Sequence, residues 1–219
     1  MMTSRFLLPA LGALGLALLP GCPDAEGKFN DFQDDYEAIH PPTSSSSSSG
    51  TGGSCAAPAA GELDGPYVFA LSASIDPPNP VLFDAQLTTT DGASGLEMSF
   101  VLHALDAKDR MTKVGESIPL GPFAVAADGT FEADFPPLAV VGVANPISGS
   151  DLEADVAISG TVCGAGGLVC GALNGSVTKP ADIALDGSAF AFEPLDAPGS
   201  YPAQPTLNCN GDLAKPLGM

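Results

Sequence analysis

From Cys55 onward the chain alternates apolar and polar residues, and this period of two constrains the fold more than any other feature. Successive side chains of a β-strand point to opposite faces, so the alternation predicts strands with one buried and one solvated face. In one stretch, for example, Phe83, Ala85 and Leu87 alternate with Asp84 and Gln86. The pattern predicts strands over residues 66–75, 81–90, 95–105, 122–127, 130–138, 152–162, 168–179 and 184–193.

Glycines mark the turns between these strands. Asp91-Gly92, Asp128-Gly129 and Gly166-Gly167 stand where hairpin loops belong. Gly187 stands where the last strand changes the parity of its apolar residues, which predicts a bulge or bend there. No segment in this region has a helical period, which excludes parallel βαβ folds. We therefore predict an all-β domain of about eight antiparallel strands, a small meander β-barrel, with a two-sheet β-sandwich as the alternative.

The charge balance narrows the range of partners. The chain has 26 acidic against seven basic residues, a formal net charge of −19. Such a surface repels phosphate backbones, so we expect no nucleic-acid partner. The sequence also contains no Walker A loop, no GxGxxG after a strand and no GxSxG, so no motif predicts a cofactor.

The first 22 residues predict export. Residues 1–5 carry one positive charge at Arg5, and residues 6–19 are almost wholly apolar. Fourteen helical residues rise about 21 Å, short of the roughly 30 Å of a hydrocarbon core, so the segment indicates a cleavable signal. The sequence Leu19-Pro20-Gly21-Cys22 follows, with an aliphatic residue three positions before the cysteine and a small residue directly before it. This resembles the lipobox of bacterial lipoproteins, with Pro20 where a small residue is usual.

The resemblance implies where the protein is located in the cell. In lipoproteins the signal, here residues 1–21, is removed and the cysteine, here Cys22, receives acyl chains such as palmitate, so the membrane is a partner. Pro23, where an aspartate would retain the protein elsewhere, implies the outer membrane of the cell envelope. Loss of Arg5 leaves six basic residues against 26 acidic ones, a net charge of −20. The overall plan also resembles uncharacterised surface lipoproteins of predatory, GC-rich bacteria. The alternative is an ordinary secreted protein with a spare Cys22.

The chain between the lipobox and the β domain divides in two. Residues 22–40 form an acidic spacer in which Phe29, Phe32, Tyr36 and Ile39 recur at helical spacing, which predicts a short amphipathic helix. That helix either docks in a groove of a partner or packs on its own domain, or the segment is a disordered spacer. Residues 41–54, rich in proline, serine and glycine, form a flexible linker. Residues 55–219 are the β domain.

The cysteines predict disulfides, since an exported protein meets an oxidising compartment. With Cys22 assigned to lipid, four remain. A hairpin at Gly166-Gly167 places Cys163 opposite Cys170, and Cys55 would then pair with Cys209 across the ends of the domain. A zinc site is the alternative, but no CxxC pair is present, and we predict no metal.

We find no set of residues that predicts catalysis. His103 shares a strand face with Ser99 and Glu97, but alternate residues of a strand project in parallel and do not converge as a triad. We therefore expect His103 to be a solvated surface residue. One strand presents three carboxylates on a single face, which leaves a two-carboxylate hydrolase or a weak Ca²⁺ site as alternatives to a solvated surface: Asp151, Glu153 and Asp155.

Three functions remain open. The first is a lipid-anchored, non-enzymatic β module displayed for structural or protein-binding purposes, with another envelope protein as partner. The second is a carrier, because an eight-stranded barrel is just wide enough to hold one small ligand. Its interior would be lined by apolar residues of the inward faces, namely Phe69, Phe83, Leu87, Met98, Phe100 and Val156. The third is a hydrolase with an unrecognised carboxylate site.

Overall fold

The computed structural model describes residues 56–93, 95–163 and 165–218. The predicted signal peptide, the lipidation site Cys22, the spacer, the linker and Cys55 lie outside the described residues. Among the described residues, no helix has the length and apolar character needed to cross a membrane.

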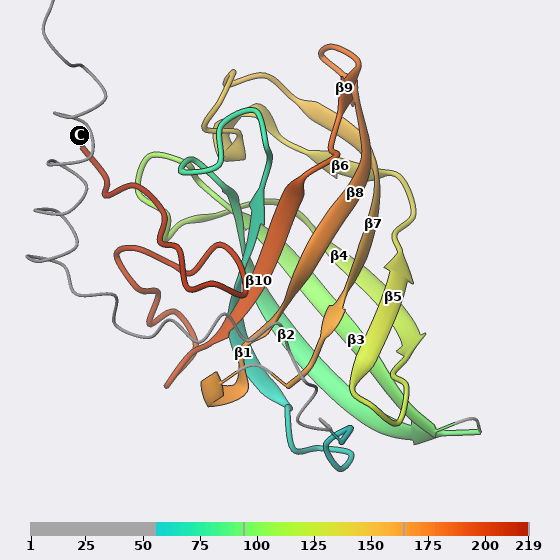
Figure 1. Cartoon of the computed structure of the whole chain (residues 1–219). Helices are drawn as coiled ribbons and strands as arrows, with labels where there is room; N and C mark the ends of the chain where they lie inside the picture. Colours follow the sequence, from blue (N-terminus) through green and yellow to red (C-terminus); the bar gives the residue numbers. More distant parts are fainter. Residues whose placement is uncertain (1–55, 94, 164, 219) are drawn as a thin grey trace, which may run out of the picture. The chain divides into compact units, whose positions relative to one another are not determined.

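The described chain is all-β, as predicted (Figure 1). Two short 3-10 turns, η1 (Gly142–Ala144) and η2 (Ala165–Gly167), interrupt a succession of strands. The strands are β1 (Gly65–Ser72), β2 (Val81–Gly92), β3 (Gly95–Leu105), β4 (Lys113–Ala124), β5 (Thr130–Asp134), β6 (Leu138–Val140), β7 (Leu152–Thr161), β8 (Val169–Lys179), β9 (Ile183–Ala184) and β10 (Ser188–Pro194).

All strand pairs are antiparallel and belong to one curled sheet, a half-barrel (Figure 1). Eight strands follow the order β4-β3-β2-β1-β10-β8-β7-β5, with β6 paired to β7 and β9 to β8. This is a meander whose first strand pairs with its last, as in an up-and-down barrel. The opening of the sheet lies instead between β4 and β5, the two ends of this strand order. An isolated bridge between Val125 and Phe131 links them.

Proline and glycine explain where the predicted strands differ from the observed ones. The expected strand over 130–138 is divided into β5 and β6 by Pro136-Pro137, since proline cannot donate to a ladder. The fourth strand begins at Lys113, nine residues earlier than expected, because Gly115, Pro119 and Gly121 concealed its period. The bend predicted at Gly187 is confirmed: this residue has a φ of 75° between β9 and β10.

Strand β1 is buried on both faces, whereas the sequence pattern suggested that each strand keeps one solvated face. Its inward residues join the main core. Its outward residues Val68 and Ala70 join a second cluster with Leu82 and with Leu207 and Ala214 of the C-terminal segment. Residues 195–218 therefore cover the outer face of the sheet near β1 (Figure 1).

A disulfide fastens that segment. Cys170 of β8 is bonded to Cys209, with 5.3 Å between their Cα atoms. The predicted pairings Cys163–Cys170 and Cys55–Cys209 are therefore wrong. The β7–β8 connection occupies residues 162–168, so Thr161 and not Cys163 lies opposite Cys170. Cys163 is disulfide-bonded as well, and stabilisation of the domain by disulfides is confirmed.

Candidate functional site

The interior of the half-barrel is filled with aromatic side chains over much of its length. The rings of Phe69 and Phe192 stack with centroids 3.9 Å apart, and those of Phe100 and Phe192 with centroids 4.7 Å apart. Phe69, Phe83 and Phe190 are fully buried in the same cluster. We call this region the aromatic core; it leaves no room for a ligand among these rings.

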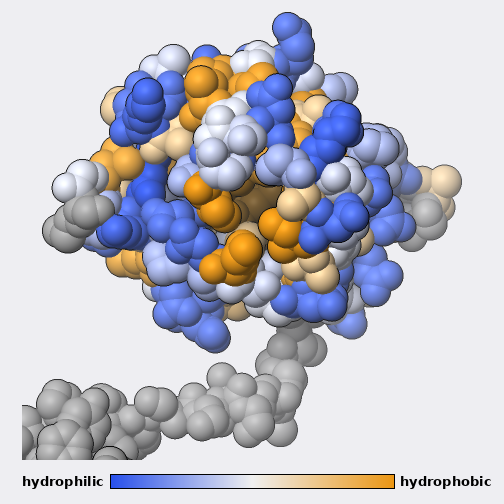
Figure 2. All heavy atoms as spheres, turned by 90° about the horizontal axis from the view of Figure 1, so that it is seen from above, coloured by the Kyte–Doolittle hydropathy of each residue, from blue (hydrophilic) through white to orange (hydrophobic). Residues whose placement is uncertain are grey.

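An apolar cavity of about 120 Å³, which we call the mouth pocket, lies at one end of the interior. It is bounded by the end of β1, the start of β2, parts of β7 and β8, β6 and β9, and the loop after η1. Figure 2 shows a hollow lined by hydrophobic residues and surrounded by hydrophilic ones. Its lining is apolar except for Asn145 and Ser148, and consists of Leu71, Ala73, Ile75, Val81, Leu138, Val140, Asn145, Ile147, Ser148, Leu152, Ala154, Val156, Leu173, Val177, Pro180, Ile183 and Leu185.

The strands change residue size between the two regions. Along β1 the inward positions are Phe69 in the aromatic core and then Leu71 in the mouth pocket, followed directly after the strand by Ala73. Along β7 the inward positions Val156 and Ala154 line the pocket. Since side chains on one face of a strand recur every second residue, β1 and β7 continue their buried faces into the pocket with smaller side chains. The cavity results from this loss of volume.

The two polar residues of the lining direct their polar groups into the loop. The Asn145 side-chain amide donates to the Ser148 hydroxyl at 2.6 Å and to the Ser150 carbonyl at 2.8 Å. The Asn145 side-chain oxygen accepts from the Ile147 N–H at 3.0 Å. Among the described residues no buried side-chain nitrogen or oxygen lacks a partner. The pocket is thus suited to an apolar group, because it offers few unengaged hydrogen-bonding groups to water.

Of the residues predicted to line a ligand cavity, only Val156 lines the mouth pocket. The other five do face the interior, as the alternation indicates, but they are packed in the main core: Phe69, Phe83, Leu87, Met98 and Phe100. Sequence reasoning missed most of the pocket lining. The one signal in the sequence for this lining was that the inward faces of the strands continue with aliphatic residues, at Leu71 and Ala154.

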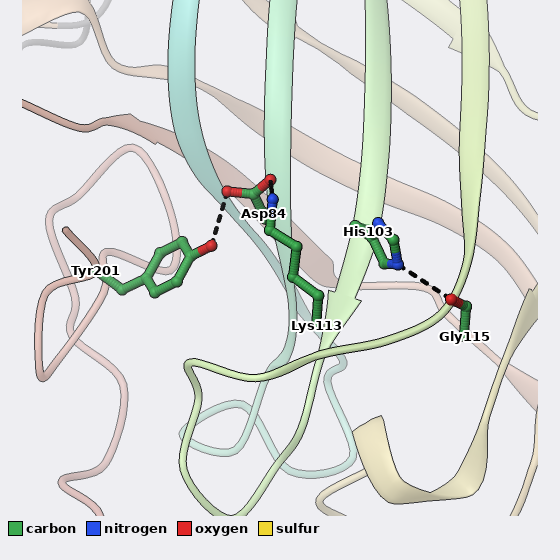
Figure 3. Close-up of polar contacts among 5 residues, drawn as sticks. All are labelled: Asp84, His103, Lys113, Gly115 and Tyr201. Atoms are coloured by element: carbon green, nitrogen blue, oxygen red, sulfur yellow. Dashed lines mark hydrogen bonds and ion pairs between the residues drawn. The ribbon is translucent and has the colours of Figure 1, made fainter. Parts of the chain in front are cut away.

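Polar contacts on the outer surface fasten the C-terminal segment and β4 to β2 (Figure 3). The Tyr201 hydroxyl donates to one oxygen of Asp84 at 2.7 Å, and the Lys113 ammonium pairs with the other. Burial, together with the hydrogen bond to Asp84 and its charge, raises the pKa of Tyr201 well above its ordinary value. His103 is half-buried, and its Nε2 lies 3.0 Å from the Gly115 carbonyl oxygen, so it has a protein partner that the sequence did not indicate.

The three carboxylates predicted to share one strand face, of which Asp151 lies just before β7, do not line the mouth pocket. Asp151 accepts a hydrogen bond from the Gly142 N–H at 2.7 Å. Glu153 pairs with Lys179 at 2.6 Å, and Asp155 is exposed. In the part of the chain that the structure describes, no group of three or more His, Cys, Asp or Glu side chains is placed to hold a metal ion.

Comparison with known proteins adds no identification: no protein-family description matches the chain, and no curated protein or solved structure is significantly similar to it.

Proposed function

We propose that this chain is a lipid-anchored protein of the cell envelope whose non-enzymatic β domain binds a small apolar group in the mouth pocket. The observation that carries the proposal is the cavity itself, which is apolar, has a volume of about 120 Å³ and lies beside the filled aromatic core. An apolar cavity of roughly 150 Å³ holds a benzene-sized molecule. The mouth pocket thus suits one ring or the end of an aliphatic chain.

The binding experiment uses 1-octanol as the ligand and the full chain with Cys22→Ser, so that no acyl anchor competes. We expect saturable one-site binding by calorimetry, with a negative heat-capacity change because apolar surface is buried. Ala154→Leu, which places three more carbons in the pocket, should weaken binding about fivefold or more. Ala157→Leu is the matched control, since Ala157 lies on the opposite face of β7. Absence of saturation, or equal affinity in both variants, would contradict the proposal.

The anchor rests on Cys22, which the lipobox resemblance selects for acylation, and we place the protein at the outer membrane. In cells of the source organism, Cys22→Ser should move the chain from the membrane fraction to the soluble fraction. Continued recovery with the membrane would overturn this part of the proposal.

A second function, capture of an envelope protein partner, is favoured by the rim of the same pocket. Ile75 is 59% exposed and Ile147 is 43% exposed, and both belong to the pocket lining. Such apolar rims accept side chains of a partner. Solvent extraction of protein purified from native envelopes distinguishes the two: a carrier releases an apolar molecule, and a partner-binding module releases none.

A further inference from the structure

The basic residues of the β domain are distributed unevenly. The chain contains seven, of which Arg5 and Lys28 lie outside the described residues. Of the other five, Lys113 and Lys179 form ion pairs with Asp84 and Glu153. The remaining three form no ion pair within the described part of the chain, and all of them line a single groove: Lys108, Arg110 and Lys215.

This basic groove has a volume of about 550 Å³ and lies between the loop after β3, the loop around η1 and the C-terminal segment. No acidic residue is found in its described lining, although the chain has 26 of them. Three cations without an ion-pair partner among the described residues place positive charge along this groove, and such charge attracts anions.

Arg110 is held in place at the base of this groove. Its side chain is largely buried, and Nη1 donates to the Lys215 carbonyl at 2.7 Å, which joins two walls of the groove. Its φ of 56° is in the left-handed region that non-glycine residues rarely adopt. The two carboxylates of this loop bond backbone N–H groups and do not line the groove: Asp106 accepts from the Lys108 N–H, and Asp109 accepts from the N–H groups of Met111 and Thr112.

The basic groove adjoins the mouth pocket. Asn145, Ile147 and Ser148 line both, so one loop forms the boundary between an apolar cavity and a cationic one. The exposed side chain of Ile147 continues the apolar surface from the pocket across to the groove.

We propose that the basic groove is the headgroup subsite of the mouth pocket, and that the ligand is an amphiphile with an aliphatic chain and an anionic carboxylate or phosphate head. The inference rests on the proposed function, because it assigns the chain of the amphiphile to the mouth pocket. Lys108 and Arg110 would meet the head together with Lys215, through charge-assisted hydrogen bonds.

The experiment compares ligands that share a chain and differ in the head: octanoate, octyl phosphate and 1-octanol, titrated calorimetrically into the full chain with Cys22→Ser. We expect at least one of the two anions to bind about tenfold tighter than the alcohol, the effect of one good hydrogen bond to a charged group. The better anion identifies the headgroup class. Equal affinity for all three ligands would overturn the headgroup subsite and leave the apolar pocket intact, whereas no binding of any ligand would overturn both.

A pair of double variants tests the location. Lys108→Gln/Lys215→Gln, both at exposed side chains, should abolish the preference for the anion and leave 1-octanol affinity unchanged. Lys113→Gln/Lys179→Gln removes the same number of charges outside the groove and should retain the preference. A preference that survives the first double variant, or is lost equally in both, would contradict the proposal.

Discussion

The two ends of the half-barrel interior are both formed by the inward faces of strands, and β1 and β2 contribute to both, yet one end is filled and the other is hollow. In the aromatic core, Phe192 lies between the rings of Phe69 and Phe100. In the mouth pocket, the apolar lining consists of aliphatic residues and one proline, and a cavity of about 120 Å³ remains. The pattern of alternation decides which face is buried, whereas side-chain volume decides whether that face encloses a space.

The two ends of the interior also contribute differently to stability and to binding. Dense packing contributes stability, because each buried carbon gains dispersion contacts and leaves water. An open apolar cavity forgoes part of that stabilisation and leaves room for a ligand. The aromatic core should therefore dominate stability, and the mouth pocket should dominate binding.

The largest expected effect is on the aromatic core. Phe192→Ala removes a fully buried ring and should lower the free energy of unfolding by about 3–5 kcal/mol. Ile183→Ala, at a half-buried position of the mouth pocket, should cost about 1 kcal/mol or less, because no new enclosed cavity is formed. Urea denaturation measures both, and similar losses would end the distinction between the two ends.

The disulfide on the outer surface should come next. Cys170 and Cys209 are separated by 39 residues, and replacing both with alanine should cost about 2–4 kcal/mol of unfolding free energy. Because residues 195–218 cover the outer face, affinity for 1-octanol should be unchanged. Peptide mapping without reduction should recover Cys170 joined to Cys209; a peptide joining Cys163 to Cys170 would refute the register of β7 and β8.

One substitution made at both ends should give unequal results. Ala85→Leu overfills the closely packed core beside the aromatic rings and should lower the unfolding free energy by about 1–3 kcal/mol. Ala154→Leu enters existing space and should change it by no more than about 0.5 kcal/mol. Thermal unfolding of the two variants checks this. An equal loss of unfolding free energy would mean that the mouth pocket is closed in solution and has no free space for a larger side chain.

The smallest effect concerns the outer polar contacts. Tyr201→Phe removes the hydrogen bond to Asp84 and should cost about 1 kcal/mol. The pKa of Tyr201 is raised on folding, so its contribution is complete below its ordinary value of 10.0 and is lost as the pH rises through the raised value. Stability measured from pH 9 to pH 11 should therefore fall less steeply in Tyr201→Phe than in the parent. Parallel curves would show that Tyr201 is not coupled to folding.

Much of the fold could be predicted from the sequence, because the alternation of strands such as β2 and β3 is local. The turn at Asp128-Gly129 and the bend at Gly187 were also predictable, since glycine tolerates the positive φ that both glycines adopt. The hairpin predicted at Asp91-Gly92 lies two residues later, because both residues belong to β2 and Gly92 pairs with Gly95 of β3. The pairing of Cys170 with Cys209 was not, because it depends on the register of one hairpin and on the path of a distant segment. Most of the pocket lining was also unpredictable, because it too is brought together from segments far apart in the chain.

The sequence alone thus determined the fold class and the inward face of most strands, since the period of two follows from the geometry of a single strand. Tertiary structure decided where the sheet stays open, which cysteines meet, how β1 is covered on its outer face, and which inward residues enclose a cavity. These properties depend on summed volumes and on contacts between segments far apart in the chain, and neither quantity is contained in a local pattern of residue types.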